Sequence, residues 1–279
     1  MEGKELSIVP GEPIYFAHSL SSKLKQLWIA PISDIHYGNP LFSLHHLNRT
    51  LNFIAENEHV FTVLNGDLIE ASLRTSKGDI FKQVGTPQDQ RDWIIEKLLP
   101  IKDKILGMVM GNHEDRLYKE VGVDFCADIA KSLHIPYRRE GLLLKLSFGR
   151  GNDGHPECKY TYFLAMTHGY GGARTKSAKA VKVERLATWI HADVYIMSHD
   201  HVVNTSPDVY LMPDPRTHID EDTGFRIGKV TAKRKMLVKT NAYLKWGGYS
   251  EMGGFPPVDL ETPIIKFAGS GKPKVKVEV

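Results

Sequence analysis

The chain has 279 residues, of which 42% are hydrophobic and 25% charged, an ordinary balance for a globular protein whose core needs no covalent staples. Its two cysteines, Cys126 and Cys158, lie far apart and outside any metal-ligand spacing, so we expect two buried thiols in a reducing compartment. No run approaches the roughly 18 apolar residues of a membrane span, and a net charge of +3 is too small to indicate a partner.

The N-terminal segment MEGKELSIVPGEP lacks the apolar region of a signal peptide, which favours a cytoplasmic protein with no membrane partner. Beyond it, short apolar runs alternate with segments of helical spacing, the pattern of an α/β domain. Pro100 is expected to end one of the helices. The expected strands are 27–32, 60–64, 105–110, 142–148, 160–166 and 194–197, and the expected helices are 44–56, 92–99, 123–133 and 178–190.

The chain shows no internal repeat and no segment that resembles an interdomain linker, so we expect a single domain over residues 1–279. Two stretches, 72–90 and 206–224, are typical of loops or small cap elements, and the second is rich in Asp and Pro. The C-terminal part, 225–279, is expected to be rich in β-structure and interrupted by a glycine-rich loop.

Polar residues directly follow five of the expected strands. In an open α/β sheet, the loops beyond the carboxyl ends of the strands converge on one crevice. Five strands that each deliver metal-type side chains to that edge are hard to arrange by accident. The five segments are Asp34-Ile35-His36, Asn65-Gly66-Asp67, Gly111-Asn112-His113-Glu114, His168-Gly169 and Ser198-His199-Asp200-His201.

The spacing within these segments is also informative. Asp34 and His36 are two residues apart, as are His199 and His201, so on extended backbone each pair would project to one side. Ile35 would then point into the core. The sequence therefore predicts paired ligands at the ends of two strands.

Two glycines, Gly66 and Gly111, would let the backbone turn tightly so that Asp67 and Asn112 can approach an ion. Asp and His side chains without cysteine suit borderline or hard divalent cations such as Mn, Fe, Zn or Ni. The sequence therefore predicts a divalent metal site.

The ordered series D-x-H, G-D, G-N-H-E, H-G and x-H-x-H resembles that of the calcineurin-like metallophosphoesterases, a family of nucleases, phosphodiesterases and protein phosphatases. The match runs from Asp34 to His201 and rests on about a dozen positions. Each piece alone is a weak signal, but all five in order, each after an apolar run, form a strong one. The resemblance implies an α/β fold in which helices flank a central β-sandwich and metals bind at the carboxyl ends of strands.

The resemblance also implies a cofactor and its ligands. The cofactor would be two divalent ions, with manganese expected and iron, zinc or nickel as alternatives, which together activate a water for in-line attack on phosphorus. One ion would be held by Asp34, His36, Asp67 and His201, and the other by the shared Asp67 with Asn112, His168 and His199.

In the family, the residue at the position of His113 does not bind metal. It faces the scissile phosphate and stabilises or protonates the leaving oxygen, a task that suits an imidazole near neutral pH. Glu70, three residues after Asp67, would orient His113.

Two departures from the family pattern stand out. Ser198 occupies a position where glycine is usual. Ala71 stands where phosphoprotein phosphatases carry a phosphate-clamping arginine, which Arg74 or Arg116 could replace. The missing arginine indicates a protein closer to the nucleases and phosphodiesterases.

The predicted function is therefore a metal-dependent phosphodiesterase or nuclease acting on nucleic acid or nucleotides. Basic clusters at 174–185 and 229–239 leave room for an anionic substrate, although such runs are more often a solvated face. A phosphomonoesterase acting on protein or small-molecule phosphates is the alternative. A non-catalytic scaffold ranks last, because scaffolds usually lose a ligand or the catalytic histidine and this chain has lost neither.

Overall fold

The computed structural model describes residues 15–279 except 75, 77–79, 152–156, 253 and 258. The N-terminal segment that was examined for a signal peptide therefore lies outside the described residues. The described strands form two six-stranded sheets. The first contains, in spatial order, β1 (Phe16–Ser19), β6 (Leu142–Phe148), β7 (Tyr160–Thr167), β8 (Val194–Met197), β10 (Arg226–Lys239) and β9 (Asn204–Ile219). The second contains β12 (Val275–Glu278), β11 (Ile264–Ala268), β2 (Gln26–Ile29), β3 (Val60–Asn65), β4 (Ile105–Val109) and β5 (Tyr137–Arg138).

The two sheets pack face to face through a shared apolar layer. Leu144, Leu164 and Ile196 of the first sheet meet Ile29 and Val63 of the second, and all five are fully buried. Burying each such side chain stabilises the fold by roughly 1.5–3 kcal/mol. The predicted α/β fold with a central β-sandwich is confirmed.

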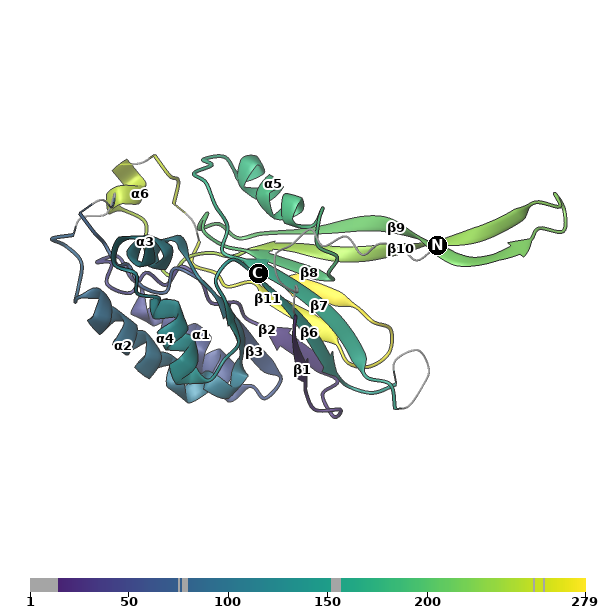
Figure 1. Cartoon of the computed structure of the whole chain (residues 1–279), viewed down its shortest axis with the longest axis horizontal. Coiled ribbons are helices and arrows are strands. Elements are labelled where there is room, and N and C mark those ends of the chain that lie inside the picture. The colour runs from purple at the N-terminus through teal and green to yellow at the C-terminus, as the bar shows by residue number, and fades with distance from the viewer. Residues whose placement is uncertain (1–14, 75, 77–79, 152–156, 253, 258) are drawn as a thin grey trace.

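Helices cover the outer faces of the sandwich (Figure 1). They are α1 (Leu44–Glu56), α2 (Pro87–Leu98), α3 (Asn112–Val121), α4 (Phe125–Leu133), α5 (Lys176–Leu186) and α6 (Gly248–Met252), with a 3₁₀ segment at Leu99–Lys104. Leu47 of α1, Ile94 of α2 and Ile129 of α4 share one core cluster with the second sheet. Val183 of α5 packs on Tyr195, on the outer face of the first sheet. Among the described residues, no helix is both long and apolar enough to cross a bilayer.

Most predicted elements are present, with shifted ends. Helix α1 has the predicted bounds, whereas α2 begins at Pro87, five residues earlier than predicted. The earlier start has a local cause, because the Thr86 side chain and the Asp89 carboxylate form a capping box. Helix α3 was not predicted, and it begins inside the Gly-Asn-His-Glu motif at Asn112.

The prediction of a loop or small cap element at 206–224 is wrong for most of that stretch, because strand β9 covers it as far as Ile219. Strands β9 and β10 pair antiparallel and continue beyond the sandwich as a long two-stranded ribbon (Figure 1). Both faces of the ribbon meet solvent, because Leu211 and Met212, which are neighbours in β9 and point to opposite faces, are 70% and 40% exposed. Without a buried face there is no apolar alternation to indicate a strand, and the prolines favoured a loop.

The cysteines follow the prediction only in part. Both are unpaired, but Cys126 is buried and Cys158 is exposed. The expectation of two buried thiols is therefore wrong for Cys158.

Candidate metal centre

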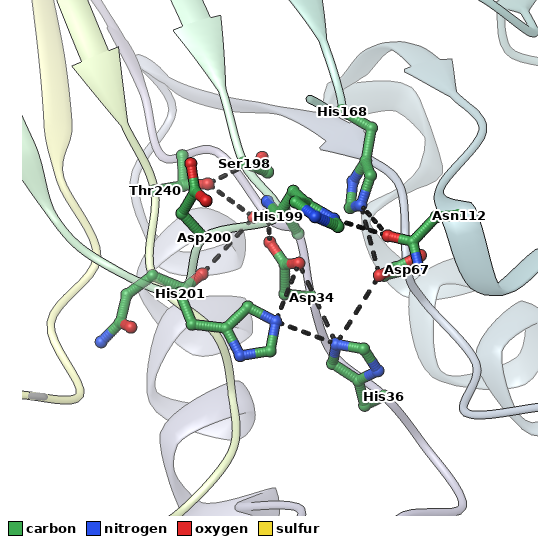
Figure 2. Close-up of polar contacts among 12 residues, drawn as sticks. Asp34, His36, Asp67, Asn112, His168, Ser198, His199, Asp200, His201 and Thr240 are labelled. Carbon is green, nitrogen blue, oxygen red and sulfur yellow. Dashed lines mark hydrogen bonds and ion pairs between the residues drawn. The ribbon is translucent and has the colours of Figure 1, made fainter. Parts of the chain in front are cut away.

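The seven predicted ligands converge at one edge of the sandwich, where strands of both sheets end (Figure 2). Backbone hydrogen bonds continue past the strand ends and hold the loops side by side. The Asp34 amide donates to the Gly66 carbonyl at 2.9 Å, and the His36 amide donates to the Asp67 carbonyl at 3.0 Å. The ligand-bearing loops are thus positioned by extension of the sheet pairing.

Asp34, His36 and His201 form the first group of metal-type side chains. His201 Nε2 lies 3.2 Å from Asp34 Oδ1 and 3.2 Å from His36 Nε2, and His36 Nε2 lies 3.9 Å from Asp34 Oδ1. Asp34 Oδ1 is buried, yet within the described part of the chain it accepts no hydrogen bond of regular geometry. An orphaned buried carboxylate oxygen beside two imidazole nitrogens fits a cation.

Asp67, Asn112, His168 and His199 form the second group. His168 Nε2 lies 3.2 Å from Asp67 Oδ2 and 3.0 Å from Asn112 Oδ1, which in turn lies 2.6 Å from His199 Nδ1. The group offers carboxylate, amide and imidazole donors in one place, a mixed oxygen and nitrogen set that suits a divalent ion.

The Asp67 carboxylate lies between the two groups. Its Oδ2 is 3.2 Å from His168 Nε2 in one group and 3.8 Å from His36 Nε2 in the other. Its Oδ1 accepts a hydrogen bond from the His113 backbone amide at 2.8 Å. This position is what a carboxylate shared by two ions requires, and the ligand roles themselves stay a prediction.

Hydrogen bonds fix the orientation of the imidazole rings. His168 Nδ1 donates to the Asn65 carbonyl at 2.8 Å, which leaves Nε2 facing the centre. His199 is reversed, because its Nε2 donates to the Gly171 carbonyl at 2.5 Å and its Nδ1 faces Asn112. Such outer contacts set the tautomer and direction of a metal-binding histidine.

Glu70 contacts His113 in a different way from the one expected. His113 Nδ1 donates to the Glu70 backbone carbonyl at 2.5 Å, and its Nε2 lies 3.9 Å from Asp67 Oδ2. The Glu70 carboxylate lies instead 3.2 Å from His36 Nδ1. Glu70 therefore orients His113 through its main chain and His36 through its side chain. His36, Asp67 and His113 also form a third group close enough to hold an ion, so a ligand role for His113 is an alternative to its predicted one.

Backbone strain is concentrated in this centre. Of the seven described non-glycine residues with positive φ, five are predicted ligands. The expectation of extended backbone is therefore wrong, because single residues in the left-handed region turn the side chains inward. Each costs of order 1–3 kcal/mol and persists only where the surroundings enforce it. The five are Asp34, His36, Asp67, His199 and His201.

Gly66 and Gly111 allow a close approach of two loops, whereas the sequence predicted a tight turn at each of them. Gly66 has a φ of 82°, and a Cβ there would lie 2.6 Å from the Gly111 Cα. A Cβ on Gly111 would overlap the Asp67 backbone. Both positions require glycine for the two loops to touch.

Glu114 is a site residue to which the sequence assigned no role. Its buried carboxylate accepts backbone N–H bonds from Asp67 at 3.1 Å, Leu68 at 2.7 Å, Ile69 at 3.1 Å and Gly111 at 3.2 Å. Burial, reinforced by the Asp67 charge, raises the pKa of Glu114 to about 7 despite these donors. Its place in the Gly-Asn-His-Glu motif was the available signal, and its contacts show that it shapes the Asp67 loop.

Ser198 fits its position without strain. Its hydroxyl accepts hydrogen bonds from Asn65 Nδ2 at 2.5 Å and from the Thr240 hydroxyl at 2.7 Å. Thr240 also contacts Ser33 at 2.7 Å. The serine thus links the ends of β3, β8 and β10 behind the ligands.

The carboxylates of the centre favour protons on two of its imidazole rings, those of His36 and His168. Burial alone lowers the pKa of His168, but the Asp67 carboxylate outweighs it and raises the pKa to about 10. Burial likewise opposes a proton on His36, but the Glu70 and Asp67 carboxylates raise its pKa to about 9. The metal-free protein therefore holds positive charge where ions are predicted to bind.

This protonation predicts that metal binding releases protons. At neutral pH, below both raised pKa values, we expect release of close to two protons per protein molecule, one from His36 and one from His168. Metal affinity should rise with pH and level off above the raised pKa values. Calorimetric titration with Mn²⁺ in buffers of different ionisation enthalpy measures the release, and binding without proton release would contradict the prediction.

Comparison with known proteins gives one family match. The family model described as Calcineurin-like phosphoesterase matches residues 27–203, more than half of the chain. No protein of curated function matches. One similar solved structure is Yfce, a phosphoesterase from E. coli, with 18% identity and a TM-score of 0.35; the alignment covers 63% of this chain and 71% of that chain. A second is the calcineurin-like phosphoesterase YfkN from Bacillus subtilis, with 13% identity and a TM-score of 0.43; the alignment covers 91% of this chain and 90% of that chain. A third is Vps29 complexed with Zn²⁺ from Entamoeba histolytica, with 13% identity and a TM-score of 0.35; the alignment covers 90% of this chain and 98% of that chain.

Proposed function

Because the chain belongs to the calcineurin-like phosphoesterase family, we propose that it hydrolyses phosphodiesters, as a phosphodiesterase or nuclease that uses two divalent metal ions. Family membership supports metal-dependent phosphoester hydrolysis in general. The diester preference and the pair of ions are the finer parts of the proposal, and both depend on particular residues.

The observation that carries the proposal is the place of Asp67 between two groups of ligand-type side chains, with His113 beside it. Asp34, His36 and His201 would hold one ion together with Asp67, and the second group would hold the other. Two such ions, when bound, would supply Lewis acidity and neutralise charge on the phosphate.

The remaining tasks fall to the protein. His113 Nδ1 donates to the Glu70 carbonyl, so its Nε2, 3.9 Å from Asp67 Oδ2, would donate a proton to the leaving oxygen when the ring is protonated at both nitrogens. Burial lowers the pKa of His113 and outweighs the Asp67 and Glu70 carboxylates, which act to raise it. A ring with a lowered pKa is a stronger acid once it is protonated.

The diester preference rests on the missing arginine. Ala71 is fully buried and its side chain is a methyl group, so this position brings no cation to the site. Arg116 lies three residues after His113, on the same face of α3. Its Nε and Nη2 atoms are buried and, among the described residues, have no hydrogen-bond partner. Because these two nitrogens are closed to solvent, Arg116 would have at most its remaining nitrogen, Nη1, for a substrate phosphate, which does not restore the clamp.

The function is tested by comparing two chromogenic substrates with metal-depleted protein supplied with Mn²⁺. We expect bis(p-nitrophenyl) phosphate to be hydrolysed with a higher kcat/KM than p-nitrophenyl phosphate, and EDTA to abolish turnover until metal is restored. Faster turnover of the monoester would favour the phosphomonoesterase. Inactivity on both substrates with Mn, Fe, Zn and Ni would contradict the proposal and favour a scaffold.

The substrate class is then resolved with a panel of single- and double-stranded DNA, RNA and cyclic nucleotides under the same metal conditions. Cleavage of a polymer would identify a nuclease. Turnover of cyclic nucleotides alone would identify a nucleotide phosphodiesterase.

A further inference from the structure

The loop that carries His199 and His201 is held from behind by buried lysines. Both histidines have positive φ, 70° and 50°, so the loop adopts a conformation that non-glycine residues rarely keep without support. Asp200, between them, is buried and its side chain points away from the His201 ring (Figure 2). The loop thus presents two imidazoles to the centre and one carboxylate to the protein interior.

Two lysines bind the Asp200 carboxylate, one on each oxygen. Lys182 Nζ of α5 lies 2.6 Å from Oδ1, and Lys239 Nζ, at the end of β10, lies 2.6 Å from Oδ2. The side chains of Asp200, Lys182 and Lys239 are 2%, 10% and 0% exposed. Charge pairs this deeply buried hold a fixed geometry, because separating them would strand a charge away from water.

The same cluster also binds the main chain on either side of His199. Lys239 Nζ donates to the Ser198 carbonyl at 2.8 Å. Lys179 Nζ, one turn before Lys182 on α5, donates to the Asp200 carbonyl at 2.9 Å. Each histidine is therefore preceded by a carbonyl that a buried ammonium group holds in place.

The charge balance of this cluster is unusual. Lysine is almost never fully buried unless paired, yet among the described residues three buried ammonium groups contact Asp200, two at its carboxylate and one at its main-chain carbonyl. A device that served only to dock α5 on the sheet would not need contacts to the two carbonyls of the ligand loop. The sequence suggested a solvated or substrate-facing basic cluster, but Lys179 and Lys182 are turned inward and are not available to substrate.

We propose that Lys179, Lys182, Lys239 and Asp200 form a lysine cradle, a set of positioning residues that holds His199 and His201 in the geometry that metal binding requires. The inference rests on the proposed function only in taking the two histidines as ligands. The cradle makes metal affinity depend on side chains that themselves touch no metal.

The sharpest test is Lys179→Met, because it removes one ammonium group and leaves both lysine contacts to the Asp200 carboxylate in place. Mn²⁺ affinity is measured by calorimetry on the full metal-depleted chain. Loss of an outer contact of this kind typically weakens metal binding about 10–100-fold, and we expect Lys179→Met at the lower end and Asp200→Asn at the upper end. The control is Lys176→Met, an exposed lysine of the same helix, which should bind Mn²⁺ like the wild type.

A second measurement separates positioning from general stability. The visible absorption spectrum of bound Co²⁺ reports ligand geometry, and it should change in Lys179→Met while the melting temperature of the metal-free protein stays close to that of the wild type. If Asp200→Asn fails to fold, Lys179→Met alone decides the question. Wild-type affinity together with a wild-type Co²⁺ spectrum in Lys179→Met would overturn the cradle.

The outcomes distinguish the cradle from the proposed function. A wild type that binds Mn²⁺ but hydrolyses no phosphoester contradicts the function, and the ratio of affinities still tests the cradle. Equal affinities in active wild type and Lys179→Met contradict the cradle alone. A wild type that binds no divalent ion overturns both.

Discussion

Replacing Asp67 by Asn should abolish tight binding of at least one ion and lower kcat/KM for phosphodiesters by about a thousandfold or more. Bound metal ions supply several kcal/mol of charge stabilisation in the transition state, and each 1.4 kcal/mol corresponds to about a tenfold change in rate. An amide has nearly the same shape as the carboxylate, so the hydrogen bond from the His113 amide can persist and the fold should survive.

The measurement combines metal content of the purified variant with steady-state kinetics at increasing Mn²⁺. Asp67→Asn also removes the charge that raises the pKa of His168, so this pKa, followed by NMR in the metal-free state, should fall. Asp103→Asn, a change of an exposed carboxylate in the 3₁₀ segment, is the matched control. Retention of two ions and of activity in Asp67→Asn would exclude a shared role for this carboxylate.

Replacing His113 by Ala should lower kcat about 10²–10⁴-fold, the usual contribution of general acid–base catalysis, while Mn²⁺ affinity stays within a few-fold of wild type. The reason is geometric. The His113 ring is anchored at Nδ1 by the Glu70 carbonyl, and its Nε2 lies near Asp67 without belonging to either main ligand group. The loss should be greatest for diesters with poor leaving groups, because these need protonation most.

The experiment is a comparison of diesters whose leaving groups differ in pKa, together with a metal titration of the same variant. His45→Ala, a change of an exposed histidine on α1, controls for loss of an imidazole elsewhere. A large fall in metal affinity in His113→Ala would assign His113 to the third ligand group instead. A loss that is independent of leaving-group pKa would argue against proton donation.

The convergence of the predicted ligands could be foreseen because each follows an apolar strand. Val60–Asn65 is buried almost throughout and ends two residues before Asp67, and Val194–Met197 ends two residues before His199. An apolar run identifies a buried strand, and parallel strands deliver their following loops to one edge. The backbone conformation of these loops could not be foreseen, because positive φ at His199 or Asp67 is imposed by tertiary contacts.

Two features that the sequence did not predict, the role of Glu114 and the lysine cradle, depend on contacts between segments that are distant in the sequence. Glu114 accepts hydrogen bonds from residues 67–69, and Lys239 binds a loop about 40 residues away. Nothing in local spacing separates these buried charges from solvated ones. The β9–β10 ribbon was not predicted for a different reason, because its residues lack the alternation of buried and exposed side chains that identifies a strand.

Both sheets contribute predicted ligands to the centre, four from the second sheet and three from the first. Asp34, Asp67 and Asn112 lie beyond strands of the second sheet, whereas His168 and His199 lie beyond β7 and β8 of the first. Cations bound here would therefore cross-link the two sheets of the sandwich. The free energy of metal binding would then add to the free energy of unfolding of the protein. At a free-ion level a hundred times Kd, this contribution is about 2.7 kcal/mol. Removing the ions with a chelator would then lower the stability of the whole protein as well as abolish its activity.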